Sequence, residues 1–565
     1  VFNRESNLKI IINHGSVFQR VITGTVVDEL GSPVPNVTIK VESSVPSRAA
    51  ATNPEGKYSI QINSDSEVLV FSYVGYTTQK ITVGKNTTLD VKLLSDDKNS
   101  LEEVAVVAFG TQKKADLVGS VVSVKVSDLK IPSSNLTTAL AGRIPGMIAF
   151  QRGAEPGNDN ANFFIRGVTT FGYKNDPLIL IDNMEVGTTE LARLQTDDIA
   201  SFSVMKDATS TALYGARGAN GVILITTKQG AVGKAQISFR VENSISSSVK
   251  DIELADPVTF MKLANEAVLT RNPLGQVLYS DEKIANTGVG QNPIIYPAND
   301  WRELVFKDYT SNQRYNLNVS GGGEVAKYFV SGSLNKDNGL LKVDQRNNFN
   351  NNIDLTSYAL RSNVNINLTK TTEMVVRLSG NFDEYTGPID GGAEMYRKVM
   401  RTNPVLFPQY YPLDEQHQFV KHIMFGNSDV GGKNYINPYA DLVRGYKDSS
   451  RSLMLAQLEL KQDLSFFTKG LNFQLMANTN RTSFFDVTRA YNPYYYNLIG
   501  YNPEESTYAI DAMNEDSGTE YLNYSPGNRI LNSVFYAQSQ LNYSRAFGKH
   551  GVSALLVTML QNNLS

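Results

Sequence analysis

The chain has 565 residues, a formal net charge of −3 and no cysteine. A chain of this length exceeds one ordinary hydrophobic core, so several domains are expected. The small net charge gives no electrostatic footprint for nucleic-acid binding, and the missing cysteines exclude disulfides and a cysteine nucleophile. Only four histidines occur, none in the usual metal-binding pairs, so neither a metal site nor another cofactor is expected.

Residues 1–19 form an N-terminal segment with little pattern, whereas residues 20–95 alternate short apolar runs with turn residues. Strands are predicted over Val21–Asp28, Val37–Glu42, Lys57–Ile62, Val68–Tyr73, Thr77–Val83 and Thr88–Leu93. Several short strands in so short a segment are typical of a β-sandwich.

Residues 96–110 form a charged linker that contains the apolar, β-branched segment Leu101–Phe109. Its composition favours an extended strand. Two interpretations remain open. The segment joins the sheet of a partner protein by β-augmentation, or it is the first strand of the following domain.

Residues 111–230 mix short strand and helix patterns with many glycines. At their end, a short helix is predicted over Lys206–Leu213, followed by Gly215, Gly218 and Gly221 and by the strand Val222–Thr227. A phosphate-binding loop needs the opposite order, from strand to loop to helix, so nucleotide binding is not expected. The glycines are instead expected to permit positive φ angles and close backbone packing.

Charged residues in the same region are assigned structural roles. Asp182 stands in a tight turn after the predicted strand Leu178–Ile181. Arg166 and Arg217 are expected to form buried ion pairs with acidic groups such as Glu185.

From residue 231 to residue 565 apolar and polar residues alternate, as in Ile237, Phe239 and Val241. A soluble sandwich shows the same alternation, but a polar face this rich in Asn, Gln, Glu and Arg suits a wet barrel lumen. Eight aromatic residues near strand ends would suit the aromatic girdles of a membrane barrel, and the alternative is that they are ordinary strand aromatics. They are Tyr328, Phe329, Phe382, Tyr385, Phe466, Phe467, Phe484 and Phe485. Three long polar segments between the strands, residues 249–312, 385–450 and 491–524, are the best candidates for a substrate and partner surface.

The sandwich segment resembles the carboxypeptidase-regulatory-like domain in its G-T-V-V-D, G-x-Y-S-I and F-S-Y-V-G-Y motifs. The run L-E-E-V-A-V-V-A-F-G-T-Q-K-K-A-D-L-V-G-S-V (101–121) resembles the signature before the plug of SusC/RagA-type TonB-dependent outer-membrane transporters. The motifs A-G-R-I-P-G-M (141–147), F-I-R-G-V (164–168), P-L-I-L-I-D (177–182) and the stretch 203–230 resemble plug motifs of that family, in the family's order. One departure is Ala108-Phe109, where the family often has Gly-Tyr.

The resemblance implies a mainly β protein with a sandwich at 20–95, a linker with the TonB box at 96–110, an α+β plug domain at 111–230 and the N-terminal part of a transmembrane antiparallel β-barrel at 231–565. The TonB-box residues would be Glu103, Val104, Ala105, Val106, Val107, Ala108 and Phe109. The plug residues with structural roles would be Arg166, Asp182, Gly215, Arg217, Gly218 and Gly221. A barrel of 22 strands, at roughly 10 residues a strand plus loops, needs more residues than follow Gly230, so an N-terminal part of a longer protein is expected.

The function implied is TonB-dependent import of a nutrient oligomer across the bacterial outer membrane, with no enzymatic activity. A glycan is the first expectation for the cargo, and an oligopeptide is the second. Expected partners are TonB with its ExbB/ExbD energising complex, a SusD-like surface lipoprotein as a lid, and outer-membrane lipid. The sandwich would lie in the periplasm. The alternative is a surface glycan-binding multi-domain β-protein that transports nothing. The sequence leaves the substrate-binding residues, the oligomeric state and the role of the sandwich open.

Overall fold

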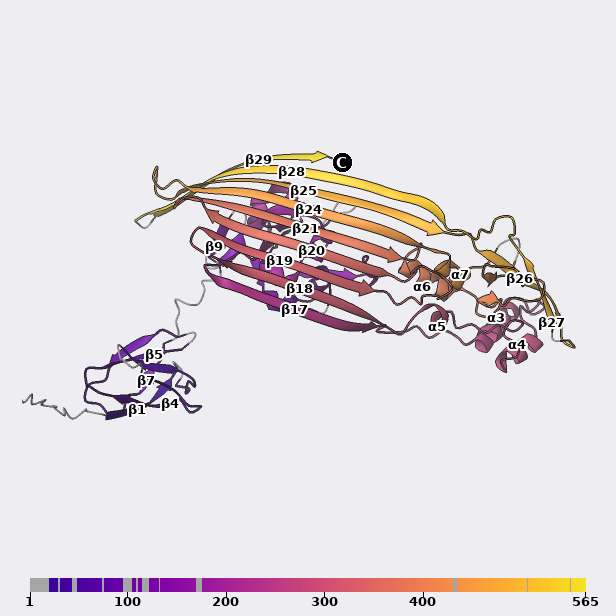
Figure 1. Ribbon diagram of the computed structural model, residues 1–565, viewed down its shortest axis with the longest axis horizontal. Coiled ribbons are helices and arrows are strands. Elements are labelled where there is room, and N and C mark those ends of the chain that lie inside the picture. The colour runs from indigo at the N-terminus through magenta and orange to yellow at the C-terminus, as the bar shows by residue number, and fades with distance from the viewer. Residues whose placement is uncertain are drawn as a thin grey trace, which may run out of the picture. The chain divides into compact units, whose positions relative to one another are not determined.

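The computed structural model describes residues 20–28, 31–42, 48–73, 76–94, 104–107, 110–113, 121–131, 133–168, 175–429, 434–505, 507–548 and 550–564. The chain divides into two compact units (Figure 1). The first holds the N-terminal strands, and the second holds residues 106–108 and all residues from 118 onward.

The first unit is the β-sandwich that the sequence predicts. One sheet has the order β4 (Lys57–Ile62), β1 (Arg20–Val27), β7 (Val91–Lys92). The other has the order β3 (Ala49–Ala51), β2 (Thr38–Val41), β5 (Val68–Ser72), β6 (Gln79–Thr82). Alternate residues of β2 and β4 are buried, as the period of a half-buried strand requires. Strand β3 is not predicted from the sequence, because three alanines have little strand propensity.

After the sandwich come two short strands, β8 (Val104–Val107) and β9 (Gly110–Lys113), which form a two-stranded sheet. The extended conformation predicted for this segment is therefore present over β8. Glu103, Ala108 and Phe109 lie outside the described residues.

The plug domain is built on a five-stranded sheet of order β10-β15-β16-β13-β14. The strands are β10 (Val121–Val124), β13 (Leu178–Ile181), β14 (Met184–Val186), β15 (Ile199–Met205) and β16 (Val222–Thr227). A separate hairpin pairs β11 (Met147–Gln151) with β12 (Ala161–Ile165). Strands β13 and β16 pair in parallel at the centre and are buried on both faces, which explains their continuous apolar sequences.

Helices of the plug domain are short: α1 (Thr188–Arg193), α2 (Ala208–Thr211) and the 3₁₀ turns η2 (Val126–Leu129), η3 (Leu136–Leu140), η4 (Thr196–Asp198) and η5 (Ala212–Gly218). The helix predicted over Lys206–Leu213 is only partly correct. Asp207 caps α2, and the chain then tightens into η5, which is broken at Gly215 by φ 56° and ψ −142°.

Nine antiparallel strands in simple order form one large sheet, here called the wall sheet (Figure 1). They are β17 (Gly233–Ser247), β18 (Tyr309–Gly322), β19 (Ala326–Asn338), β20 (Asp354–Asn367), β21 (Thr372–Gly387), β24 (Gly445–Asp463), β25 (Leu471–Ala490), β28 (Asn523–Phe547) and β29 (His550–Leu564). These strands have 13 to 25 residues, far more than the usual strand of a soluble protein.

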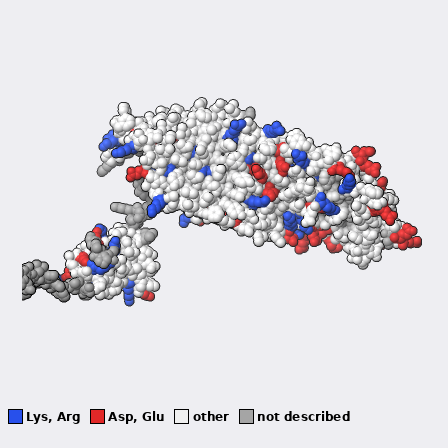
Figure 2. Space-filling view, viewed as in Figure 1, with Lys and Arg blue, Asp and Glu red and all other residues white. Residues whose placement is uncertain are grey.

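The two faces of the wall sheet differ, as the alternation predicts. One face packs against the plug domain and carries buried Asn, Gln and Arg side chains, among them Asn316, Asn363 and Gln457. The other face exposes large apolar side chains, such as Phe239 at 65% and Leu360 at 62% exposure. Figure 2 shows that the middle of the wall sheet is largely uncharged, whereas acidic side chains gather at the end where the long connections lie.

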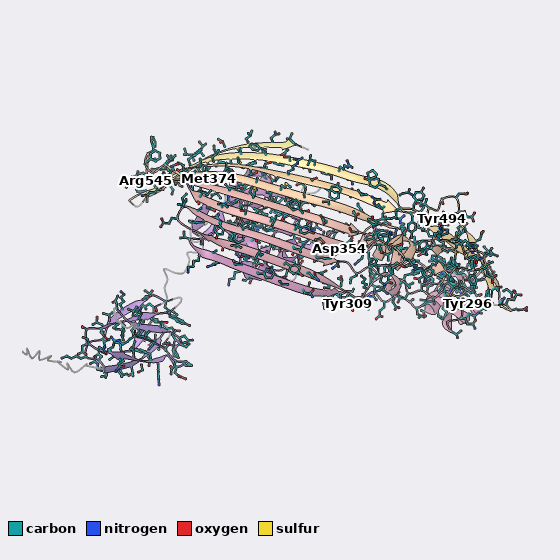
Figure 3. All side chains as sticks on the ribbon, viewed as in Figure 1. Tyr296, Tyr309, Asp354, Met374, Tyr494 and Arg545 are labelled. Atoms are coloured by element: carbon teal, nitrogen blue, oxygen red, sulfur yellow. The ribbon has the colours of Figure 1, made fainter. Side chains whose placement is uncertain are left out.

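Those long connections form a small domain at one end of the wall sheet, here called the cap. It contains α3 (Pro257–Arg271), α4 (Asp281–Gly288), α5 (Trp301–Val305), α6 (Gly392–Arg401), α7 (Pro438–Val443) and a sheet of β22 (Tyr410–Tyr411), β23 (Met424–Gly426), β26 (Tyr494–Asn502) and β27 (Thr507–Ala512). Figure 3 labels Tyr309 and Asp354 where β18 and β20 begin near the cap, with Tyr296 and Tyr494 inside it.

The cap has its own hydrophobic core, in which Trp301, Met395 and Phe425 are almost fully buried. The sequence predicts a helix over Asp256–Leu269, and α3 (Pro257–Arg271), the longest helix of the cap, confirms it. Helices α4 to α7 are not predicted, because each is short and lies in a polar segment. Among the described residues, no helix is long and apolar enough to cross a membrane.

Candidate functional site

The polar face of the wall sheet meets the plug domain through ion pairs. Arg240 of β17 places its Nε 2.8 Å from Oδ2 of Asp197, and Arg361 of β20 places its Nε 3.5 Å from Oδ2 of Asp198. Both aspartates belong to η4, the short turn that leads into β15. Both aspartate side chains are at most 10% exposed. Arg361 is also buried, so its pair with Asp198 is held away from water, whereas Arg240 is 29% exposed.

Asp182 is the most buried carboxylate of this interface, with a side chain only 1% exposed. It accepts hydrogen bonds from the backbone N–H of Thr227 at 2.9 Å and from its hydroxyl at 2.5 Å. Nε of Arg377 on the wall sheet lies 3.9 Å away, and Nη1 of the same arginine lies 2.8 Å from Glu459. Asp182 therefore joins the end of β16 to the wall sheet.

The turn that presents Asp182 explains why this residue follows β13. Asp182 and Asn183 have φ angles of +50° and +67°, the left-handed region in which Asp and Asn are the best-tolerated side chains besides glycine. Two consecutive positive φ angles produce a tight hairpin whose twist matches its strands, here β13 and β14. The tight turn predicted at this position is confirmed.

The three glycines before β16 act through backbone conformation and close packing. Gly221 has φ +90°, and a Cβ there would lie 2.7 Å from Cδ1 of Ile165 and 3.1 Å from the carbonyl oxygen of Met205. Gly215 has φ +56°. Gly218 packs against α2, where a Cβ would lie 3.0 Å from a carbonyl oxygen. These geometries agree with the structural role assigned to the glycines.

The two arginines singled out in the sequence lie on the surface of the plug domain. Arg217 forms the expected ion pair with Glu185, but the two side chains are 46% and 42% exposed, so this pair is not buried. Arg166 has φ +59° and an exposed side chain, and no ion pair joins it to another residue in the described ranges. Its backbone N–H donates to the carbonyl of Gly146 at 2.8 Å.

A loop of the plug domain also contacts the cap. Glu155 accepts hydrogen bonds from the backbone N–H groups of Gly392 at 2.9 Å and Ala393 at 3.1 Å, which open helix α6. A carboxylate at this end of a helix is favoured by the unpaired N–H groups and by the helix dipole. The hydroxyl of Tyr385 lies 3.5 Å from the same carboxylate. One side chain thus links the plug domain, the wall sheet and the cap.

The cap contains a pocket of about 710 Å³ between its small sheet and neighbouring loops. His422 lies in it, stacked on the ring of Tyr494 with centroids 3.8 Å apart. The two ring nitrogens of His422 lie 3.1 Å from Glu520 and 3.0 Å from the hydroxyl of Tyr496. In the described ranges no three His, Asp or Glu side chains come together in a way that suits a metal ion.

A charged cluster forms one wall of this pocket. Arg346 lies over the ring of Tyr410, 4.3 Å from its centroid, and forms an ion pair with Asp344 at 2.7 Å. Burial acts to raise the pKa of Asp344, but hydrogen bonds from Arg346 and Tyr439, together with the arginine charge, lower that pKa to about 2. Asp344 is therefore ionised at every physiological pH.

Comparisons with known proteins agree with this architecture. The family model described as "CarboxypepD_reg-like domain" matches residues 22–106, and the "TonB-dependent Receptor Plug Domain" model matches residues 113–222. TonB-dependent receptor P26 of Formosa agariphila is 31% identical over 451 residues, which cover 78% of this chain and 41% of that protein. TonB-dependent receptor SusC of Bacteroides thetaiotaomicron is 27% identical over 79% of this chain and 41% of SusC.

The chain belongs to the SusC-type family of TonB-dependent receptors. It spans about two-fifths of the length of these curated relatives. Among solved structures, the RagAB peptide importer in its open-open state matches with a TM-score of 0.57 and 17% identity, over 81% of this chain and 56% of that one. Its closed-closed state matches with a TM-score of 0.54, 19% identity and coverage of 79% and 49%. These likenesses show that the SusC-type receptor has the same fold.

In this SusC-type receptor, residues Val104–Val107 of the predicted TonB box form the strand β8, which pairs with β9 in a two-stranded sheet. β8 uses one edge to pair with β9, and within the described residues its other edge has no strand beside it. An unpaired edge is what β-augmentation by a partner requires. The assignment of Glu103 to Phe109 as the TonB box stays a prediction.

The sequence does not identify the wall-sheet arginines that form ion pairs with the plug domain. Arg377 and Arg240 appear in the sequence only as polar members of alternating strands. A signal was present, because arginine on the inward face of a strand needs a carboxylate partner when it is buried. The sequence does not show which carboxylates lie opposite, since the partners are between 43 and 195 residues away along the chain.

Some of the predicted girdle aromatics also belong to the inside of the SusC-type receptor. Phe329 is 2% exposed, Tyr385 contacts Glu155, and Phe484 lines a pocket next to the plug domain. For these three residues the girdle interpretation is wrong. The alternation of the strand, rather than nearness to a strand end, decides which face an aromatic side chain occupies. Phe466, Phe467 and Phe485 are exposed, as a girdle would require.

Proposed function

We propose that this receptor imports a nutrient oligomer across the bacterial outer membrane by TonB-dependent active transport. The observation that carries the proposal is the wall sheet with two different faces. Its apolar face suits contact with lipid. Its polar face is covered by the plug domain, which ion pairs such as Asp182–Arg377 attach to the wall sheet. A filled lumen passes no oligomer unless the plug domain rearranges, so import requires an external source of energy.

The energy would arrive through the segment Glu103–Phe109. TonB, energised by ExbB and ExbD, would add a strand to the free edge of β8 and pull on it. Because the ion pairs between plug domain and wall sheet are few and separated along the interface, a pull would release them in succession. This would be an order–disorder switch of the plug domain. The sandwich at residues 20–95 would lie in the periplasm and hold this segment at a distance from the membrane.

Substrate would be captured at the cap, under a SusD-like surface lipoprotein that acts as a lid. The cap pocket offers aromatic faces and amide or hydroxyl groups, which suit sugar rings. A glycan is the first candidate, in line with the relationship to SusC. An oligopeptide is the second, because RagAB, which has the same fold, is described as a peptide importer. The receptor would carry out no chemical reaction on either cargo.

The test uses the full-length gene product in its native host. Residues 103–109 are deleted, membrane insertion is checked by surface labelling, and uptake of labelled glycans and peptides is measured with and without a protonophore. We expect normal insertion with loss of uptake, and the cargo that no longer enters identifies the substrate class. Unchanged uptake of every cargo would overturn the proposal. Cargo binding at the surface without uptake in the wild type would support instead a non-transporting glycan-binding protein.

A further inference from the structure

A second pocket, of about 440 Å³, lies where the plug domain, the wall sheet and α6 meet. The plug domain contributes residues 155–158, Thr189 and Arg193, and the wall sheet contributes residues of β21, β24 and β25, which Figure 1 shows side by side. This volume is within the range of ligand pockets in proteins. A ligand in this pocket touches the plug domain and the wall sheet at once.

Most charged side chains that line this pocket are already paired. Arg193 and Asp383 form a buried ion pair with Nε and Oδ2 2.9 Å apart, and Glu155 accepts the first N–H groups of α6. The remaining pairs are Asp390 with Lys398 at 2.7 Å, Asp390 with Arg444 at 3.1 Å, and Lys447 with Asp486 at 2.6 Å. Each of the three lining carboxylates therefore already has at least one partner.

Arg451 is the exception among the described charged residues of the pocket, because no carboxylate lies within ion-pair distance of it. Its guanidinium lies over the ring of Phe484, 5.5 Å from the centroid, and its side chain is partly exposed. Asp383 stands directly opposite Arg451 in the strand register. Its Oδ2 accepts from Nε of Arg193, whereas its Oδ1 has no hydrogen-bond partner and lies beyond ion-pair distance of Arg451. An arginine oriented by an aromatic ring, with its fork of donors free, recognises a carboxylate bidentately.

We propose that this pocket binds a carboxylate group of the imported oligomer, with Arg451 as its cationic partner and Phe484 as the support of the guanidinium. The inference rests on the proposed import function and adds the chemical class of the cargo. The carboxylate is that of a uronic acid in a glycan or that of an acidic residue in a peptide. Since residues 155–158 of the plug domain line the same pocket, the bound carboxylate lies beside the loop that contacts α6.

The test uses the full-length receptor and two pairs of probes. One pair is an oligo-uronate and its methyl ester, and the other is a glutamate-rich peptide and its glutamine counterpart. Binding and uptake of each probe are measured for the wild type, for Arg451→Gln and for Arg489→Gln. Arg489 is a matched control. Its guanidinium also lies over an aromatic ring, that of Tyr524 at 5.4 Å, but its side chain is on the face of β25 opposite to that of Phe484, away from the pocket.

We expect the wild type to bind one carboxylated probe about tenfold or more tightly than its neutral counterpart, as loss of a charge-assisted hydrogen bond implies. Arg451→Gln should abolish this preference, whereas Arg489→Gln should retain it. The probe pair that shows the preference identifies the source of the carboxylate.

No preference in either pair, or a preference that survives Arg451→Gln, would overturn the inference. If the probes enter in a manner that depends on residues 103–109 but without this preference, the inference fails and the import function stands. If no probe enters in that manner, the import function itself fails.

Discussion

Substitution of Asp182 by asparagine tests whether the buried carboxylate holds the plug domain together. Asparagine tolerates the φ of +50° at this position, so the change removes charge without imposing backbone strain. The two hydrogen bonds from Thr227 then lose their charge-assisted character, and the attraction to Arg377 at 3.9 Å is lost. Each charge-assisted bond exceeds a neutral one by about 1 kcal/mol, so the expected cost is about 2–3 kcal/mol.

Hydrogen exchange of the β16 amides in the full-length receptor measures this cost. A loss of about 2–3 kcal/mol in the opening free energy speeds exchange by about 30- to 150-fold. Glu185→Gln is the matched control, because its ion pair with Arg217 is nearly half exposed and is worth about 0–1 kcal/mol. Exchange within about threefold of wild type for Asp182→Asn, or an equal effect of Glu185→Gln, would refute the reasoning.

Three further outcomes are expected. Gly221→Ala should destabilise the plug domain by about 1–3 kcal/mol, because φ is +90° and the new Cβ would lie 2.7 Å from Ile165; unchanged β16 exchange would contradict this. The pKa of Asp344 falls on folding from 3.8 to about 2, so its stabilisation of the cap is present above about pH 4 and is lost towards pH 2. In acid unfolding monitored by tyrosine circular dichroism, Asp344→Asn should remove this contribution to the loss of stability between about pH 4 and pH 2. An acid-unfolding curve that Asp344→Asn leaves unaltered would contradict this prediction. Glu155→Gln should speed exchange at the first turn of α6 by about tenfold, and no change there would exclude a link between plug domain and cap.

Much of the fold follows from local patterns in the sequence. The sequence predicts the central strands β13 and β16 with their observed bounds, because a short apolar run between turn signals has few other interpretations. The two faces of the wall sheet follow from strict alternation. The motifs around residues 101–121, 141–147, 164–168 and 203–230 indicate the TonB-dependent family, and the match to the plug-domain model supports it.

The site was less predictable, because it depends on contacts between distant parts of the chain. Nothing local distinguishes Arg377, which reaches Asp182, from Arg217, whose ion pair is on the surface. The sequence predicts polar segments where the cap lies. In the structure, Trp301 and Phe425 are buried in a hydrophobic core that residues from separate segments of the chain form together. Short helices of five to ten residues owe their stability to such packing, so their own sequences give a weak signal.

The central claim is that TonB pulls on the strand β8, and single prolines in that strand test it most directly. Ala105→Pro and Val106→Pro are made separately in the full-length receptor, because alternate N–H groups point to opposite edges of a strand and proline removes one of them. Val106→Thr, which keeps the N–H and the β-branched shape, is the control. With surface-labelled receptor and cargo binding both unchanged, the account predicts that at least one proline variant loses uptake while Val106→Thr retains it. Import at the wild-type rate by both proline variants would contradict the account.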